Sequence, residues 1–275
     1  MTLKNLTVIA AAALLALTSC AGNKTGFPKI DQKGKTAIVA HRGYWNCEAA
    51  GFSENSIASL KAAQDNGLWG SECDVHITTD SVVLVFHDNK INGARIDTCA
   101  STCFADYRLP NGETIPTIDE YLDQAAKCES TILVLELKEE FTMEQEDLLV
   151  DKCIASLEEH NMLDPKRVVF ISFSKYMCDR IAAEFPEFVN QYLEGDFTPE
   201  ELAADGINGF DYEKKVIKKD STIVARAHEL GMSTNVWTVN KPEQMQYYID
   251  LGINAITTNE PMVLRELLGD KEFKL

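Results

Sequence analysis

A segment of this 275-residue sequence carries acidic side chains in an alternating pattern. Within residues 70–77, Glu72, Asp74 and His76 alternate with apolar residues, so all three share one face of a strand. Carboxylates two residues apart on a strand lie ~7 Å from each other, so both can reach one cation that prefers oxygen ligands. A solvated edge strand would show the same alternation, and this segment alone is compatible with both interpretations.

A second segment is apolar until it ends in two charges. Along residues 131–138, Glu136 and Lys138 follow two apolar side chains on the same face. Burying a charge is costly unless the charge is paired or bound to a metal. Glu136 and Lys138 are compatible with a structural pair, but beside Glu72 and Asp74 they favour a divalent cation and a phosphoryl group held together.

Two histidines follow apolar runs. His41 comes directly after residues 36–40 and His87 after residues 82–86. Two histidines near one anion can divide proton transfer between a nucleophile and a leaving group. A lone histidine after a strand is more often structural, but Arg42 beside His41 adds a phosphate donor and favours a catalytic role. The pattern of amphipathic helices around His160 and His228 predicts surface or packing roles for them.

Along the rest of the chain, short apolar runs alternate with amphipathic stretches, a pattern typical of βα units. Eight strands are predicted, the number that closes a (β/α)8 TIM barrel of α/β class with its site at the carboxyl ends of the strands. They are 36–40, 70–77, 131–137, 167–173, 189–193, 209–212, 233–237 and 255–258. Residues of about 88–116 lack this periodicity and predict a small insertion after the second strand, over one barrel mouth.

Composition restricts the function further. The chain is 45% hydrophobic, which excludes a disordered or collagen-like protein, and its formal net charge is −17. It has no run of Lys and Arg, so we expect no nucleic-acid partner. The length fits one barrel or two smaller domains, and the lack of a linker favours one barrel.

The N-terminus has the pattern of a sorting signal. Lys4 is followed by an apolar run too short to span a bilayer, and then by Leu17-Thr-Ser-Cys20. This resembles the lipobox of bacterial lipoproteins, in which Cys20 would be lipidated, and an ordinary secretory signal is the alternative. The predicted division is a lipoprotein signal peptide at 1–19, a lipid-anchored tether at 20–35 and a barrel domain at 36–275. The expected location is the bacterial cell envelope, outside the cytoplasm.

The chain has eight cysteines, of which seven remain once Cys20 is assigned to lipid. At least one thiol is then free. Cys99 and Cys103 lie in a loop-like stretch where they could pair. Three others are predicted to be small core residues, Cys73, Cys153 and Cys178.

Taken together, these motifs resemble the glycerophosphodiester phosphodiesterase family. They occur in family order from about residue 37 to 262, nearly the whole mature chain. The matching segments are 40–43 (AHRG), 53–56 (SENS), 70–75 (GSECDV), 85–88 (VFHD), 116–118 (PTI), 135–138 (LELK), 236–240 (VWTVN) and 256–261 (ITTNEP). No single segment is specific, but eight in order are.

The resemblance implies a TIM barrel with an insertion after the second strand, and a role for each site residue. The implied cofactor is one divalent cation, Ca²⁺ or Mg²⁺, and the implied products are glycerol 3-phosphate and an alcohol, released through a cyclic phosphate. The implied metal ligands are Glu72, Asp74 and Glu136, the phosphate would be held by Arg42 and Lys138, and the acid–base pair would be His41 and His87. Glu54 and Asn55 would line the same pocket, with Trp237 as an apolar wall.

The sequence departs from the family pattern at Asn259, where Asp is usual, and the role of that position is therefore open. Two other functions are compatible with the same residues. One is phospholipase-type cleavage of intact membrane lipids beside an anchoring membrane, and the other is a non-catalytic barrel that binds phospholipids or sugar phosphates. We expect a small glycerophosphodiester as the substrate and the membrane, through Cys20, as the second partner.

Overall fold

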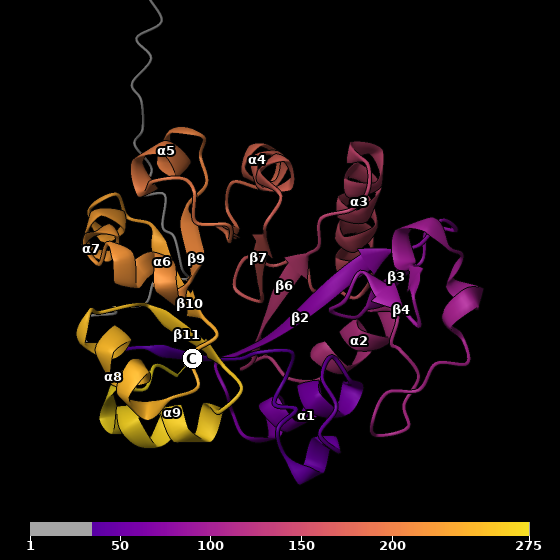
Figure 1. Ribbon diagram of the computed structural model, residues 1–275, viewed down its shortest axis with the longest axis horizontal. Coiled ribbons are helices and arrows are strands. Elements are labelled where there is room, and N and C mark those ends of the chain that lie inside the picture. Colours follow the sequence, from indigo (N-terminus) through magenta and orange to yellow (C-terminus); the bar gives the residue numbers. More distant parts are fainter. Residues whose placement is uncertain (1–34, 275) are drawn as a thin grey trace, which may run out of the picture.

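The computed structural model describes residues 35–274. Eight parallel strands form a ring in the order β1, β2, β6, β7, β8, β9, β10 and β11, and β1 closes the barrel by pairing with both β2 and β11 (Figure 1). Their bounds are Ala37–Ala40, Gly70–Ile77, Ile132–Leu137, Val168–Ser172, Val189–Tyr192, Gly209–Glu213, Ser233–Trp237 and Ala255–Thr258. The predicted single TIM barrel is confirmed, and each strand lies within one residue or so of its expected bounds.

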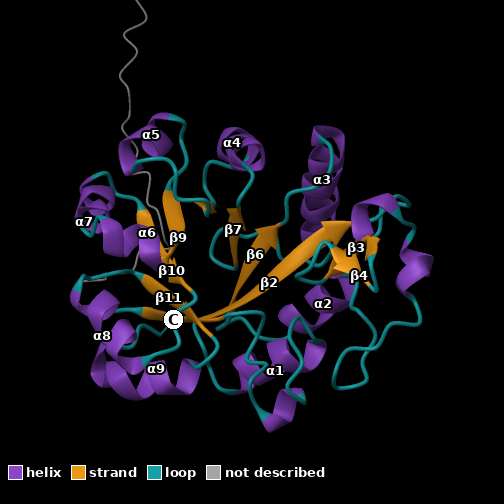
Figure 2. Ribbon diagram, viewed as in Figure 1, coloured by secondary structure: helices purple, strands orange, loops and turns teal. Residues whose placement is uncertain are grey.

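Helices follow the strands and cover the outside of the barrel (Figure 2). The main helices are α1 (Ile57–Asp65), α2 (Ile118–Ala125), α3 (Met143–Glu159), α4 (Lys175–Glu184), α5 (Pro199–Ala204), α6 (Lys214–Lys219), α7 (Thr222–Glu229), α8 (Pro242–Asp250) and α9 (Pro261–Leu268). Several begin with a side chain that caps free backbone N–H groups, as Ser56, Thr117 and Thr198 do in capping boxes. These caps fix where each helix starts relative to the strand before it.

The apolar side chains form separate layers because each strand presents alternate residues to opposite faces. One cluster fills the barrel interior and includes Val39, Val134 and Ile171. Two larger clusters pack the outward faces of the strands against the helices. All eight residues of β2 are buried, and β2 lies between β1 and β6. The alternative of a solvated edge strand is therefore wrong.

The predicted insertion is confirmed between β2 and α2, and the strand-like apolar run at 82–86, which precedes the expected insertion, forms a further strand. β3 (Val83–Val85) runs antiparallel along β2, outside the parallel ring. It is followed by the hairpin of β4 (Lys90–Ile91) and β5 (Ala94–Arg95), and by the short helices η2 (Ile96–Thr98) and η3 (Ser101–Phe104). This segment has an apolar core of its own, which includes Ile91, Ile96 and Phe104.

Two short helices complete the described elements, η1 (Glu48–Ala50) between β1 and α1 and η4 (Gly269–Lys271) after α9. In the described part of the chain, all seven cysteines are free thiols, including Cys99 and Cys103, and the three expected core cysteines are buried. Within residues 35–274, no helix combines the length and apolar character that a membrane span requires. The predicted signal peptide and Cys20 lie outside the described residues.

Candidate active site

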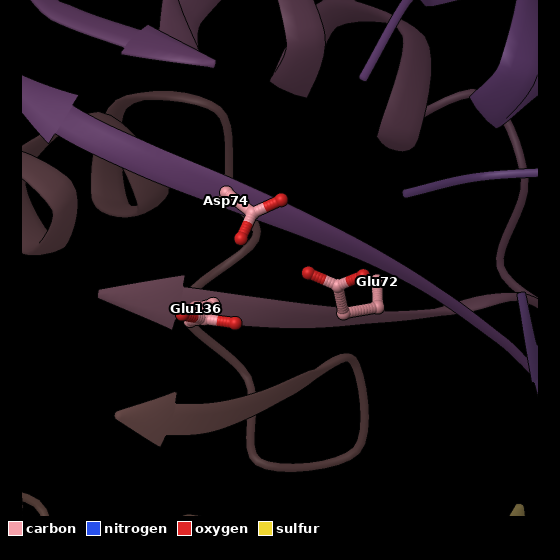
Figure 3. Close-up of side chains that lie close together, drawn as sticks. All are labelled: Glu72, Asp74 and Glu136. Carbon is pink, nitrogen blue, oxygen red and sulfur yellow. The ribbon is translucent and has the colours of Figure 1, made fainter. Parts of the chain in front are cut away.

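Three carboxylates meet at the carboxyl ends of two neighbouring strands. Glu72 and Asp74 lie on β2 and Glu136 on β6, where Asp74 and Glu136 are direct partners in the register (Figure 3). One oxygen of each lies within 4.8 Å of the others, and all three side chains are buried. The structure thus brings the three predicted ligands together at one place.

The three carboxylates differ in pKa. Burial and mutual repulsion act to raise the pKa of each, and nearby cations lower it to different degrees. Burial, followed by repulsion from Asp74 and Glu136, raises the pKa of Glu72 well above its usual value. Burial and then Asp74 raise the pKa of Glu136 to about 7. Burial would also raise the pKa of Asp74, but Lys138, His87 and Asn55 together hold it below its usual value.

One oxygen of this cluster is free. Oε1 of Glu72 is buried and has no hydrogen-bond partner among the described residues, while Oε2 accepts a hydrogen bond from the backbone N–H of Arg42 at 2.7 Å. A buried, unpaired carboxylate oxygen is unfavourable unless a ligand satisfies it. Three close oxygen donors with a free acceptor among them fit a hard divalent cation.

Lys138 and Arg42 are the cations beside the carboxylates. Nζ of Lys138 lies 2.6 Å from Oε1 of Glu136 and 3.3 Å from Oδ1 of Asp74. The guanidinium of Arg42 donates from Nη1 to Glu54 at 2.6 Å, and its Nε is buried without a hydrogen-bond partner in the described chain. Both cations are therefore held in place and keep donors available to an anion.

The turn after β1 is what brings Arg42 to the site. Arg42 has a φ of 56° and Gly43 a φ of 78°, so two successive residues adopt the left-handed region. A Cβ on Gly43 would clash with Oγ of Ser59, so only glycine allows this turn to pack against α1. The turn aims the backbone N–H of Arg42 at Glu72 and the side chain toward Asp74.

His41 is a partly buried, neutral imidazole. Its Nδ1 lies 2.7 Å from Oδ1 of Asn259, so Nδ1 carries the proton and Nε2 is left as an acceptor. Asn259 is itself held by Asn240, whose Oδ1 accepts from the backbone N–H of Asn259 at 2.9 Å. Burial and then Arg42 lower the pKa of His41 to about 4.

His87 has a different environment at the end of the run that includes β3. Its Nδ1 lies 2.7 Å from Oδ1 of Asp88, and its side chain is 37% exposed. The pKa of His87 is lowered by burial and by Lys138 and Arg42, although Asp74 and the hydrogen bond with Asp88 act in the opposite direction. His87 thus has carboxylates that favour its charged form, whereas the ring of His41 is hydrogen-bonded to an uncharged amide.

A small cavity and a larger groove meet at these residues. The cavity, of ≈ 110 Å³, is lined by both histidines, both cations, Glu72, Glu136, Phe173, Asp211, Trp237 and neighbours. The groove, of ≈ 530 Å³, is lined by His76, His87, Asp88, Asn89, Lys90, Lys138, Glu139 and Phe173. His87 therefore lies at the boundary between the cavity and the groove, whereas His41 lines only the cavity.

Glu54 and Asn55 do not line the cavity. Each is hydrogen-bonded to a residue of the site instead. Glu54 accepts from Arg42, as described above. Asn55 is buried, donates from Nδ2 to Oδ2 of Asp74 at 2.8 Å and accepts from the backbone N–H of Asp74 at 3.3 Å. The structure thus places these two as supports for Arg42 and Asp74.

Trp237 lines the cavity as expected, and the structure adds partners that the sequence did not reveal. Nε1 of Trp237 donates to the backbone carbonyl of Asp211 at 3.0 Å, and its ring contacts that of Phe173 edge to face, with centroids 5.7 Å apart. Asp211 was not predicted from the sequence to be a site residue. Like Glu72, it is a polar residue that alternates with apolar ones along a strand. His76 shares the face of Asp74, but its Nδ1 lies 3.1 Å from Oε1 of Glu140.

Comparison with known proteins identifies relatives over nearly the whole described chain. The model of the glycerophosphoryl diester phosphodiesterase family matches residues 41–263. A glycerophosphodiester phosphodiesterase of Bacillus subtilis is 26% identical over 257 residues, which cover 81% of this chain and 83% of the relative. The crystal structure of a glycerophosphodiester phosphodiesterase from Parabacteroides distasonis has 37% identity and a TM-score of 0.83, covering 86% of this chain and 98% of that one.

A more distant structure shares the fold. A phosphodiesterase from Oleispira antarctica, solved in complex with the product sn-glycerol-3-phosphate, has 21% identity and a TM-score of 0.72. It covers 86% of this chain and 98% of its own.

Proposed function

The chain belongs to the glycerophosphoryl diester phosphodiesterase family, and from that premise we propose that it hydrolyses glycerophosphodiesters to glycerol 3-phosphate and an alcohol in a metal-dependent reaction. One observation carries the proposal. Two cations, two histidines and two members of the buried carboxylate cluster, Glu72 and Glu136, line one cavity, and the third member, Asp74, lies beside them. These are the groups that phosphodiester cleavage requires: charge stabilisation at phosphorus, a base and an acid.

Glu72, Asp74 and Glu136 would hold the divalent cation. The free Oε1 of Glu72 and the all-oxygen donor set support this assignment and favour Mg²⁺ or Ca²⁺. Such an ion, when bound, supplies positive charge to the phosphoryl oxygens. Arg42 and Lys138 add to it, because the free Nε of Arg42 and the ammonium of Lys138 can donate to the non-bridging oxygens.

The two histidines divide proton transfer according to their surroundings. His41 has an acceptor Nε2 and lines only the small cavity, so it takes the proton from the glycerol hydroxyl next to the phosphoester. That oxygen then bonds to phosphorus, and the bond from phosphorus to the head-group alcohol breaks. His87, at the boundary with the groove, gives a proton to the departing oxygen.

Water completes the reaction with the roles of the histidines reversed. His87 removes a proton from water as its oxygen attacks the cyclic phosphate, and His41 returns a proton to the glycerol oxygen as its bond to phosphorus breaks. The net change is the addition of one water, with glycerol 3-phosphate and the alcohol as products. Both histidines end the cycle in their starting protonation states.

A direct assay tests this function. Purified protein is incubated with glycerophosphocholine or glycerophosphoethanolamine, and glycerol 3-phosphate is followed with and without EDTA. We expect release that EDTA abolishes and that added Mg²⁺ or Ca²⁺ restores. Activity that survives exhaustive chelation would refute the metal assignment, and no release from either diester would refute the function.

The envelope location is proposed on the N-terminal sequence alone. Cys20 follows Leu17-Thr-Ser after the apolar run, which supports lipidation and an anchor outside the cytoplasm. Labelled fatty acid should enter the full-length protein in cells and should not enter the Cys20→Ala variant. Incorporation that persists in Cys20→Ala would refute the anchor.

A further inference from the structure

Asp211 enters the cavity from the wall across the barrel from the carboxylate cluster. It lies on β9, and β2 and β9 are four places apart in the ring of eight strands, so the two strands face each other. Asp211 is 1% exposed, and it lines the cavity together with His41, Arg42 and Trp237. No role described above uses this side chain.

One carboxyl oxygen of Asp211 is fixed and the other is free. Oδ2 accepts from Nδ2 of Asn235 at 3.0 Å, and the same Nδ2 lies 3.0 Å from Oγ1 of Thr257. The backbone carbonyl of Asp211 accepts from Nε1 of Trp237. Oδ1 is buried and has no hydrogen-bond partner in residues 35–274. The carboxyl is therefore held rigidly with one polar atom left for a ligand.

The charges in the cavity decide which part of the substrate can meet this atom. The phosphate belongs with Arg42, Lys138 and the carboxylate cluster, because these supply positive charge directly or through a bound cation. A carboxylate repels a phosphate, and a protonated carboxyl supplies no positive charge to hold one. The side chains on Asp211's own wall of the cavity, Trp237 and Thr257, are uncharged, so Asp211 faces a part of the substrate that is neutral and carries a hydrogen-bonding group.

The volumes of the groove and the cavity also indicate which part of the substrate lies beside Asp211. The groove of ≈ 530 Å³ is open to the varied head group, whereas the cavity of ≈ 110 Å³ has room only for a small group. In a glycerophosphodiester, the small neutral half is glycerol. One of its hydroxyls is the nucleophile near His41, which leaves the terminal hydroxyl without a described partner.

We propose that Asp211 determines specificity for glycerol by hydrogen bonding its terminal hydroxyl through Oδ1. The proposal rests on the function given above and deepens it. A buried polar group that loses its ligand partner is left unsatisfied, so a substrate without that hydroxyl is rejected.

Two matched diesters test this. Glycerophosphoethanolamine is compared with 2-hydroxyethyl phosphoethanolamine, which keeps the hydroxyl next to the phosphoester and lacks the terminal hydroxymethyl group. Wild-type protein should prefer the glycerol diester by about 10- to 100-fold in kcat/KM. Asp211→Leu should reduce the preference to less than about threefold, mainly through loss on the glycerol diester, and Asp211→Asn, which keeps polar atoms, should retain most of it.

Gln191 supplies the matched control. It lies on the neighbouring strand β8, is 1% exposed and also has a buried oxygen without a partner in the described chain, but it does not line the cavity. Gln191→Leu should keep the wild-type preference. A folded Asp211→Leu protein with the wild-type preference, or an equal loss in Gln191→Leu, would overturn the assignment.

Binding by the wild-type protein tests the inference without any variant and without turnover. Calorimetry should show sn-glycerol 3-phosphate binding at least about 10-fold more tightly than 2-hydroxyethyl phosphate. Equal affinities would overturn the role of Asp211. Absence of turnover with preserved discrimination would instead refute the proposed function and leave the glycerol site standing.

Discussion

Nδ1 of His41 lies 2.7 Å from Oδ1 of Asn259, across 218 residues of sequence. The partner of the proposed base is thus an amide, at the position where Asp is usual in the family pattern. An amide oxygen orients the ring as a carboxylate would, but it carries no full negative charge to stabilise the imidazolium. This explains how His41 can keep its tautomer while burial and Arg42 lower its pKa to about 4.

Asn259→Asp should move the acid limb of the pH profile upward. A base must be unprotonated, so activity falls as the pH drops through the pKa of His41. A carboxylate at this distance raises that pKa by about 1–3 units, so the acid limb of kcat/KM should shift up by a similar amount. The measurement is kcat/KM for glycerophosphoethanolamine as a function of pH.

Asn46→Asp is the control for this shift. Asn46 donates to Glu260 and is not a hydrogen-bond partner of the His41 ring in the described chain, so the same added charge should leave the acid limb almost in place. If the acid limb of the Asn259→Asp profile stays at its wild-type pH, His41 is not the group whose titration causes that limb.

The assignment of His87 as the acid predicts a dependence on the leaving group. His87→Ala should lower kcat about 10²- to 10⁴-fold for glycerophosphoethanolamine, because the departing alkoxide needs a proton. The loss should shrink to less than about tenfold for a glycerol diester of p-nitrophenol, which leaves without protonation. His41→Ala should lose activity to a similar degree with both substrates, and the reverse pattern would exchange the two roles.

Glu72→Gln should separate stability from function. Burial, with repulsion from Asp74 and Glu136, raises the pKa of Glu72, so at neutral pH folding must either bury this charge or add a proton to it, and both cost free energy. Gln cannot ionise and avoids this cost, so the Tm of the metal-free protein should rise, by about 2–4 °C for each kcal/mol gained, while activity falls. Added Mg²⁺ or Ca²⁺ should raise the Tm of the wild type and not of the variant.

Glu146→Gln is the matched control for Glu72→Gln. Glu146 is also buried, but it accepts a hydrogen bond from Ser174 at 2.8 Å outside the cluster. This variant should keep its metal-dependent activity and its metal-induced rise in Tm. A metal response retained in Glu72→Gln would contradict the assignment of Glu72 as a ligand.

Local patterns were sufficient to predict the barrel and the carboxylate cluster. Strand β2 was placed at its observed bounds because Glu72 and Asp74 alternate with Cys73 and Val75, and alternation is a property of adjacent residues. Their meeting with Glu136 followed from the rule that the carboxyl ends of parallel strands share one mouth.

Other features depend on contacts between distant segments, which a single sequence does not encode locally. The run before His87 gave no sign that β3 would pair antiparallel with β2, since direction is set by the turn and the partner. Asn55 was expected in the pocket, yet it binds Asp74, because its left-handed backbone, with a φ of 51°, sets where its amide points. Asp211 was overlooked because its importance lies in a free oxygen, which only the packed barrel reveals.

We expect the reaction in this cavity to break the bond between phosphorus and the head-group alcohol. Phosphorus NMR of glycerophosphoethanolamine turnover in ¹⁸O-enriched water shows which bond breaks. We expect sn-glycerol 3-phosphate with one ¹⁸O on its phosphate, formed only with divalent metal present and not by the Glu136→Gln variant. Phosphoethanolamine and free glycerol as products, or an unchanged diester under all metal conditions, would contradict the account.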